Sequence, residues 1–494
     1  MRSTPPALAL LLPVLLLNAS PSSGGGCPPL GDPRYCTECG PCAEGEGGCR
    51  GDDQCQAGLA CAENFGALFG LPRAADVCLT PGGRPAPAFT ATVLPAVETP
   101  TGPLPAIRLP ASNPSTSMIN DAGQLTGTAS SGVPGQHRSV AFRFSTAGGM
   151  EALDPRGNQR SEGYLVNAAG DVFGAIFNGD RSRQIGLFIH RQDSGFDLLQ
   201  EGSSPRIRQA FRVAAMNAAG DVVGNVVEFR EPITDSQPFL YREGEGWQDL
   251  SALDPRLRQT QTFAGALNDA GDVLVLTNDF GFFRSFLVRG TEVVELGHFG
   301  GESTFANAIN DTGRVVGESL TEDLFTNHAF VALRPGSPLI DIHPPQFAHS
   351  YASGVTEKGV VIGSIVTRNS ADGPSADKLF TWDRRRTPKM KVQARRVDFL
   401  TLFDVPPRYE LSAAISATNE RLEVTGLVFA ADEFGGDVRI EPYLYSLPYG
   451  LLDVEALTTA AGLDVPEPVV LGINDFGDLL VVYRSDEAAA VLRP

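Results

Sequence analysis

A turn of the form Asn-Asp-x-Gly recurs along most of the chain and limits the fold more than any other feature. It returns at intervals of roughly 42 to 60 residues, a period typical of β-propellers and solenoids. Asn and Asp tolerate turn conformations, and Gly supplies the positive φ that a tight hairpin needs. We interpret the recurring Asn and Gly as structural turn residues: Asn120, Gly123, Asn167, Gly170, Asn217, Gly220, Asn268, Gly271, Asn310, Gly313, Asn474 and Gly477.

Two further copies of the turn are degraded. Val355–Gly359 has Thr356 in place of the asparagine, and we place the other copy around Ile415–Ser416, where the motif is lost. With these two copies included, the turn occurs in eight segments of the chain.

Each repeat predicts four short strands. In the clearest copy these are 305–309, 314–319, 328–333 and 339–343, with the Asn310 turn between the first two. The first strands are rich in small residues, as expected where strands converge on an axis. The third strands share an aromatic position that can fill the space between neighbouring sheets: Phe142, Phe188, Phe239, Phe286, Phe330, Phe380 and Tyr443, with Ala490 in the last copy. A meander of four strands per repeat is a propeller blade.

The two ends of the repeat region complement each other. The last repeat stops at Pro494 after three predicted strands, and residues 89–94 precede the first repeat as a lone strand. If these segments pair, no sheet edge stays exposed. We therefore expect an all-β, eight-bladed propeller of four-stranded blades, closed by the N-terminal strand. Seven or nine blades, or an open array, are the alternatives.

The start of the chain predicts export. Arg2 and the apolar stretch Ala7–Leu17 are typical of a signal peptide, and this stretch is shorter than the roughly 20 residues that span a bilayer. We expect a signal peptide at 1–25, a cysteine-rich module at 26–79, a Pro/Gly linker at 80–88 and the propeller at 89–494. A membrane anchor, or a lipid on Cys27, is the rival interpretation; otherwise the sequence predicts no transmembrane segment.

All eight cysteines lie in this module, and they predict a disulfide framework: Cys27, Cys36, Cys39, Cys42, Cys49, Cys55, Cys61 and Cys78. Zinc is the competing interpretation because Cys36, Cys39 and Cys42 have ligand-like spacing. The module contains no histidine, and the pairing of the cysteines cannot be derived from the sequence.

Two resemblances follow from these motifs. Residues 40–78 resemble small cysteine-rich modules of extracellular proteins, which implies a disulfide-knotted binding unit. The repeat, with its His328-Ala329-Phe330, resembles the bacterial extracellular HAF-repeat family over most of residues 110–494. That resemblance implies secretion and a propeller-like fold, and it implies no established chemistry. The tripeptide Arg50-Gly51-Asp52 matches an integrin-recognition motif, but we interpret it as a polar turn.

No catalytic motif is present in the sequence. The six histidines form no metal-binding pattern, so we predict no catalytic, cofactor-binding or metal-ligating residues. Calcium at the turns is an open alternative, since Asp269 and Asp272, like Asp475 and Asp478, bring paired carboxylates close together. One such turn offers fewer oxygens than calcium requires.

The charge of the chain argues against a nucleic-acid partner, because 39 Lys+Arg against 58 Asp+Glu give −19. The densest basic run, Arg384–Lys391 followed by Arg395 and Arg396, is interpreted as a solvated loop, with a dock for an anionic polymer as the alternative.

We expect a monomeric, secreted or cell-surface binding or adhesion protein that recognises an extracellular polysaccharide or protein, rather than an enzyme. The alternatives are a carbohydrate-active hydrolase or lyase with carboxylates at the channel mouth, and a structural surface protein without a soluble ligand.

Overall fold

The computed structural model describes residues 27–494 except 110–117, 132–137, 159, 179–183, 202–208, 231–232, 259–260, 280, 367–377, 384–392, 396–408, 433–437, 464–466 and 484–487. The predicted signal peptide and the basic run at 384–391 lie outside the described residues. Within the described part of the chain, no helix has the length and apolar character needed to cross a membrane.

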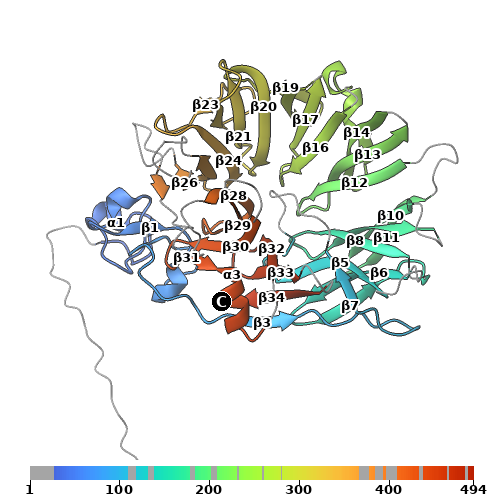
Figure 1. The fold of residues 1–494 in the computed structure, drawn as a ribbon, viewed down its shortest axis with the longest axis horizontal. Coiled ribbons are helices and arrows are strands. Elements are labelled where there is room, and N and C mark those ends of the chain that lie inside the picture. The colour runs from blue at the N-terminus through green and yellow to red at the C-terminus, as the bar shows by residue number, and fades with distance from the viewer. Residues whose placement is uncertain are drawn as a thin grey trace, which may run out of the picture.

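Antiparallel four-stranded meanders dominate the structure and surround a common centre in a propeller-like arrangement (Figure 1). The first meander contains β4 (Ala106–Arg108), β5 (Gln124–Ser130), β6 (Ser139–Ser145) and β7 (Gly149–Leu153). The second contains β8 (Ser161–Val166), β9 (Val172–Phe177), β10 (Gln184–Arg191) and β11 (Gly195–Glu201). In the second meander the first strand, β8, lies closer to the centre of the molecule than β10 and β11 (Figure 1).

The next two meanders are joined into one eight-stranded sheet by a parallel pairing of Ser236 with Gln261. One meander contains β12 (Gln209–Met216), β13 (Val222–Arg230), β14 (Ile233–Arg242) and β15 (Gly246–Asp249). The other contains β16 (Gln261–Leu267), β17 (Val273–Asp279), β18 (Phe282–Arg289) and β19 (Glu292–Glu295). Between them lie two short 3₁₀ turns, η3 (Leu250–Ala252) and η4 (Pro255–Leu257).

Three further meanders follow in chain order. The first contains β20 (Gly300–Ile309), β21 (Val315–Thr321), β22 (Asn327–Ala332) and β23 (Ile340–Asp341), which match the four strands predicted for this repeat. The second contains β24 (His349–Val355), β25 (Val361–Val366), β26 (Lys378–Trp382) and β27 (Gln393–Arg395). The third contains β28 (Tyr409–Thr418), β29 (Val424–Asp432), β30 (Val438–Ser446) and β31 (Gly450–Asp453), and helix α3 (Val454–Ala460) comes after it.

The last sheet joins the two ends of the repeat region. It contains β32 (Pro468–Ile473), β33 (Leu479–Tyr483), β34 (Ala489–Arg493) and β3 (Thr90–Val93). Strand β3 pairs with β34 from Thr90 opposite Arg493 to Val93 opposite Ala490. The segment predicted to supply the missing fourth strand therefore does pair with the C-terminal strands.

The cysteine-rich module is small and has little regular structure. It contains α1 (Tyr35–Glu38), η1 (Asp52–Gln54), η2 (Gly66–Phe69) and a two-stranded sheet of β1 (Ala60–Ala62) and β2 (Val77–Leu79). The module lies beside β30 and β31 (Figure 1). Leu447, directly after β30, joins the apolar cluster that Phe65 and the strands β1 and β2 form within the module.

The aromatic residues of the third strands are buried in the fold. All seven are at most 4% exposed, and Ala490 is fully buried. In six meanders the residue paired with the aromatic on the second strand is glycine: Gly127, Gly174, Gly224, Gly317, Gly363 and Gly426. A Cβ on Gly363 would lie only 2.5 Å from Phe380 Cε1. Glycine on one strand therefore makes room for the aromatic ring of the next.

We predict that Phe330→Ala destabilises the fold strongly. The Phe330 ring is fully buried, so its removal leaves a cavity and costs about 3–5 kcal/mol of unfolding free energy. Phe325→Ala is the matched control, because Phe325 is 82% exposed and its loss costs less than about 0.5 kcal/mol. Urea unfolding monitored by circular dichroism measures both, and equal midpoints for the two variants would contradict the packing role of Phe330.

Candidate functional site

Each Asn-x-x-Gly turn joins the innermost strand of a sheet to the second strand, and the turn at Asn310 is representative. Gly313 N–H donates to Asn310 O over 2.9 Å, and Gly313 has a φ of 77°, which a residue with a Cβ seldom adopts. The Asn310 side-chain oxygen accepts the Arg314 N–H over 2.9 Å. The asparagine side chain therefore holds its own turn closed.

The other end of each asparagine amide reaches the next turn. Asn310 Nδ2 donates to Thr356 O over 2.9 Å, and six other asparagines make the same bond to the turn that follows: Asn120 to 167, Asn167 to 217, Asn217 to 268, Asn268 to 310, Asn419 to 474 and Asn474 to 120. The Asn474 bond, 3.0 Å long, connects the last turn to the first. The turns thus gather at one end of the central region.

The seventh turn lies at Asn419–Leu422, so its predicted place around Ile415–Ser416 is wrong. Leu422 N–H donates to Asn419 O over 3.1 Å, as the glycine does in the other turns, and Leu422 has a φ of 58°. Ile415 and Ser416 lie instead at an irregularity of β28. No glycine marks this turn in the sequence, so the repeat pattern does not predict it. The spacing of Asn419 and Glu423, equal to that of Asn474 and Asp478, is the signal that remained.

The residue after each turn asparagine, or after Thr356 in the sixth turn, builds the candidate site. At six turns it is acidic, and we name these residues the acidic arc: Asp121, Asp269, Asp311, Glu357, Glu420 and Asp475. Each carboxylate accepts the backbone N–H of the equivalent residue in the preceding turn over 2.7–3.1 Å. The other two turns carry Ala168 and Ala218 at this position, so the arc has one gap.

Crowding and burial perturb the carboxyls of the acidic arc. Burial raises the pKa of Glu420, the hydrogen bond from Glu357 N–H opposes this rise, and the charges of Asp475 and Glu357 add to it, so that the pKa moves from 4.5 to about 7. Burial also raises the pKa of Asp475 and of Glu357, with like-charged neighbours adding to both shifts. Desolvated like charges of this kind produce a strong negative potential that favours a bound cation.

A cavity of about 260 Å³ lies against the arc. Glu420, Asp475 and Asn419 line it, together with small residues at the ends of the innermost strands such as Ala266 and Ala308. Small side chains leave the space open, while the carboxylates give one side of it a negative charge. We call this cavity and the acidic arc the axial mouth.

The carboxylates at the end of each turn have a different role from those of the arc. Asp272 accepts hydrogen bonds from Nε and Nη2 of Arg289, while Asn268 Nδ2 lies 3.4 Å from the same carboxylate. Asp478 likewise lies 3.6 Å from Arg493 Nε and accepts from Asn474 Nδ2. The carboxylates considered for calcium therefore have separate roles. Asp272 and Asp478 belong to structural ion pairs, whereas Asp269 and Asp475 belong to the acidic arc.

The cysteine-rich module covers part of the axial mouth. Asn64 Nδ2 donates to Glu420 O over 3.0 Å, and Lys358 Nζ donates to Asp76 over 2.6 Å and to Asn64 Oδ1 over 3.1 Å. The guanidinium of Arg73 lies 3.4 Å from the ring centroid of Phe476, next to Asp475 of the arc. Burial and the positive charge of Arg421 lower the pKa of Arg73, and the carboxylates of Asp478, Asp121 and Asp475 oppose this shift. The module thus places a cation at the edge of the acidic arc.

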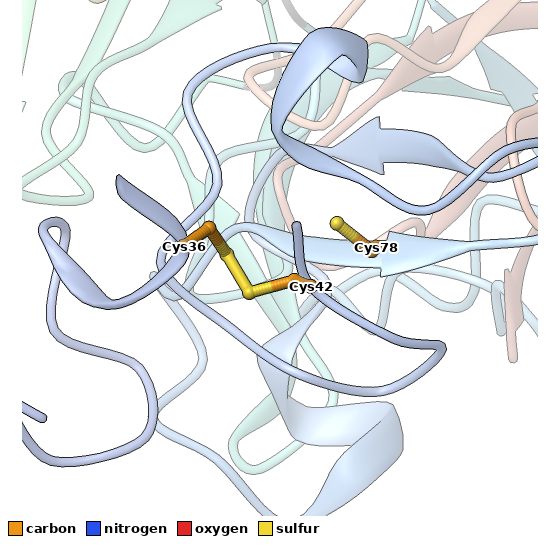
Figure 2. A group of neighbouring side chains, drawn as sticks. All are labelled: Cys36, Cys42 and Cys78. Atoms are coloured by element: carbon orange, nitrogen blue, oxygen red, sulfur yellow. A yellow bond between two sulfur atoms is a disulfide. The ribbon is translucent and has the colours of Figure 1, made fainter. Parts of the chain in front are cut away.

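The cysteines of the module form four disulfides: Cys27–Cys39, Cys36–Cys42, Cys49–Cys61 and Cys55–Cys78. Figure 2 shows the Cys36–Cys42 bond with Cys78 beside it. Zinc binds thiolates, and these sulfur atoms are committed to disulfides, so the structure does not support the zinc alternative. In the tripeptide Arg50-Gly51-Asp52, Asp52 Oδ1 accepts the Cys61 N–H over 2.8 Å, which makes the aspartate part of the disulfide knot.

Comparison with known proteins relates the chain to solved propeller structures at low similarity. No family model and no curated protein matches it. The chain aligns with Pyrococcus horikoshii acylaminoacyl peptidase at 11% identity and a TM-score of 0.40, covering 76% of this chain and 57% of that one. Its alignment with Porphyromonas gingivalis dipeptidyl peptidase 4 has 10% identity and a TM-score of 0.40, and covers 76% of this chain and 65% of that one. Its alignment with the propeller domain of the Trilobed protease from Pyrococcus furiosus has 10% identity and a TM-score of 0.36, and covers 69% of this chain and 93% of that one.

These matches contradict the prediction of a non-enzymatic binding or adhesion protein, since all three are peptidases or part of one. The physical reason for the error is that the repeats specify strands and turns, which propellers of unrelated activity share. The chain spans a little over half the length of the acylaminoacyl peptidase, and the similarity assigns no residue of this chain a catalytic role.

One serine–histidine contact resembles part of a peptidase site but serves the fold. Ser350 Oγ lies 2.9 Å from His343 Nδ1, yet Ser350 is fully buried and accepts the Ala329 N–H over 2.8 Å. Ser161 makes an equivalent bond between neighbouring meanders, to Ala141 N–H. Burial, together with the charge of His328, lowers the pKa of His343 to about 4, which makes this histidine a poor general base at neutral pH.

We predict that Glu420→Gln changes how stability depends on pH. Between pH 4.5 and about 7 the folded state holds a proton on Glu420 that the unfolded chain has released, so stability falls as pH rises through this window. Glutamine stays neutral, so the variant gains about 1–3 kcal/mol over the natural protein above pH 7.5, and the gain disappears near pH 4.5. Thermal unfolding across pH measures this, with Glu322→Gln on an exposed hairpin as the control. Parallel curves for Glu420→Gln and the natural protein would show that its carboxyl is not perturbed.

Proposed function

We propose that the chain acts in peptide processing, and that its axial mouth receives a cationic segment of a peptide. The observation that carries this proposal is the acidic arc, whose desolvated carboxylates border a cavity lined by small residues. A bound ammonium or guanidinium relieves the like-charge repulsion among these carboxylates, whereas an anionic ligand increases it. The net charge of −19 attracts the same class of ligand at longer range.

The module supplies a second argument for the cationic ligand. Arg73 lies over the ring of Phe476, an arrangement that combines cation–π attraction with the field of the nearby carboxylates. An arginine side chain of a peptide has the same chemistry as Arg73. We therefore expect arginine-containing segments to bind more tightly than lysine-containing ones, because guanidinium is planar and less strongly hydrated.

The architecture that we propose for the mouth is a closed, eight-bladed propeller. Two observations support it: β3 completes the C-terminal sheet, and Asn474 bonds back to the first turn at Asn120. A closed ring holds the arc in one shape, so that the carboxylates are positioned before the ligand arrives.

We further propose that the protein is exported as a monomer and belongs with the HAF-repeat proteins. Four disulfides favour an oxidising compartment, such as the periplasm or the extracellular space. The described residues 327–332 form the strand that contains the His-Ala-Phe element of that family.

A peptide-binding measurement tests the proposed function. We predict that a fluorescent tetra-arginine peptide binds the chain from Cys27 to Pro494, and that a tetra-glutamate peptide does not. Glu420→Gln combined with Asp475→Asn weakens binding by about ten-fold or more, because two carboxylates of the arc lose their charge. Raising the salt concentration from about 0.05 to 0.5 M weakens binding as well.

Glu322→Gln is the matched control for this measurement, since it removes a carboxylate from an exposed hairpin away from the arc. Mass spectrometry of the peptides after incubation reports cleavage in the same samples. Equal binding of the arginine and glutamate peptides, or binding that survives the double substitution, would refute the proposal. If the natural protein cleaves the peptide and the double variant neither binds nor cleaves it, the proposal extends from peptide binding to catalysis.

A further inference from the structure

Two arginine side chains cross the contact between the cysteine-rich module and the repeat region, in opposite directions. From the module, the guanidinium of Arg73 lies over the ring of Phe476, 3.4 Å from its centroid. From the seventh turn, the guanidinium of Arg421 lies over the ring of Phe65, 4.1 Å from its centroid. Both are cation–π contacts, in which the negative face of the aromatic ring attracts the cation.

The two contacts differ in how firmly they are held. Phe65 is 1% exposed and the Arg421 side chain 11% exposed, and Arg421 Nη1 also donates to Phe476 O over 2.9 Å. Arg73, in contrast, is an exposed residue in the turn Pro72–Ala75, which a 2.9 Å backbone hydrogen bond between its end residues closes. The buried contact therefore anchors the module. The Arg73 side chain can leave Phe476 by rotating about its own bonds, as exposed side chains do, while its turn stays in place.

The surroundings of the Phe476 ring suit a guanidinium. Phe476 directly follows Asp475, which belongs to the acidic arc and lines the axial mouth. The guanidinium over this ring lies in the field of three carboxylates, those of Asp478, Asp121 and Asp475. A guanidinium is planar and weakly hydrated, so it stacks on an aromatic face more readily than a compact, strongly hydrated ammonium does. The ring and the carboxylates together favour arginine over lysine.

We propose that Phe476 and Asp475 form a guanidinium subsite of the axial mouth, which Arg73 occupies until an arginine of the peptide takes its place. This inference rests on the proposed function, because it assigns a peptide arginine to one position of that mouth. Arg73 belongs to the same chain, so its effective concentration at the ring is high and a single free arginine competes poorly with it. A peptide with several arginines displaces Arg73, because its other side chains bind further carboxylates of the acidic arc. The substrate class is therefore an arginine-rich peptide.

Binding of fluorescent tetra-arginine and tetra-lysine peptides to the purified protein tests the subsite. Arg73→Ala removes the competitor, and we expect it to tighten tetra-arginine binding about two- to five-fold, the strength of an exposed cation–π contact. Arg50→Ala is the matched control, because it removes the same charge from another exposed position of the module. Phe476→Leu keeps an apolar side chain without an aromatic face, so the preference for arginine over lysine falls toward one. In the Phe476→Leu background, Arg73→Ala no longer tightens binding, because the two residues act through one contact.

The subsite is overturned if Arg73→Ala binds tetra-arginine no more tightly than Arg50→Ala does, or if Phe476→Leu keeps the natural preference for arginine. In both cases the peptide still binds, so the proposed function of the axial mouth stands. If neither peptide binds the natural protein or Arg73→Ala, the proposed function fails and the subsite fails with it. Circular dichroism verifies that every variant is folded. Should Phe476→Leu unfold, Arg73→Ala decides alone, because a substitution at this exposed position leaves the fold intact.

Discussion

The side-chain amide of the turn asparagine is the interaction on which the rest of the structure depends. Its oxygen closes one turn and its nitrogen donates to the backbone of the next, so one residue type both shapes a hairpin and joins neighbouring meanders. Six of the eight positions of this circuit are the predicted asparagines, Asn419 is a seventh, and Thr356 holds its own turn through a hydroxyl that accepts Val360 N–H. Because the asparagines satisfy the backbone, the residue that follows each of them is left available for another role.

The residue that follows the turn asparagine is acidic in most turns, and these residues give the turns a negatively charged surface. Each carboxylate of the acidic arc accepts one backbone N–H, which fixes its position but neutralises little of its charge. The raised pKa of Glu420 and of Asp475 shows that the fold holds these groups where ionisation is unfavourable. Buried carboxyls of this kind lower the free energy of unfolding at neutral pH. Groups with strongly perturbed pKa values are typical of functional sites.

The sequence predicted the local elements well and their combined effects poorly. Hairpin chemistry, the aromatic at Phe330 and the strand before the first repeat all depend on short-range patterns, and each has a counterpart in the structure. The turn at Asn419 was misplaced because Leu422 occupies a left-handed conformation that a pattern assigns to glycine. The arc and the docking of Asn64 on Glu420 link residues from distant parts of the chain, which no local pattern contains. Function was predicted wrongly for the same reason: the repeats describe the scaffold and leave the site to tertiary contacts.

The asymmetry of the arc determines how a cation approaches it. Ala168 and Ala218 leave one side of the mouth without carboxylates, while Glu357, Glu420 and Asp475 concentrate charge where the module docks. Arg73 stands at that charged sector, over Phe476, and therefore screens the carboxylates that attract a cation most strongly. For the cationic ligand proposed above, the alanine side offers fewer carboxylates, and the attraction increases toward Glu420. In the proposed function, the module therefore docks where the acidic arc attracts a cationic ligand most strongly.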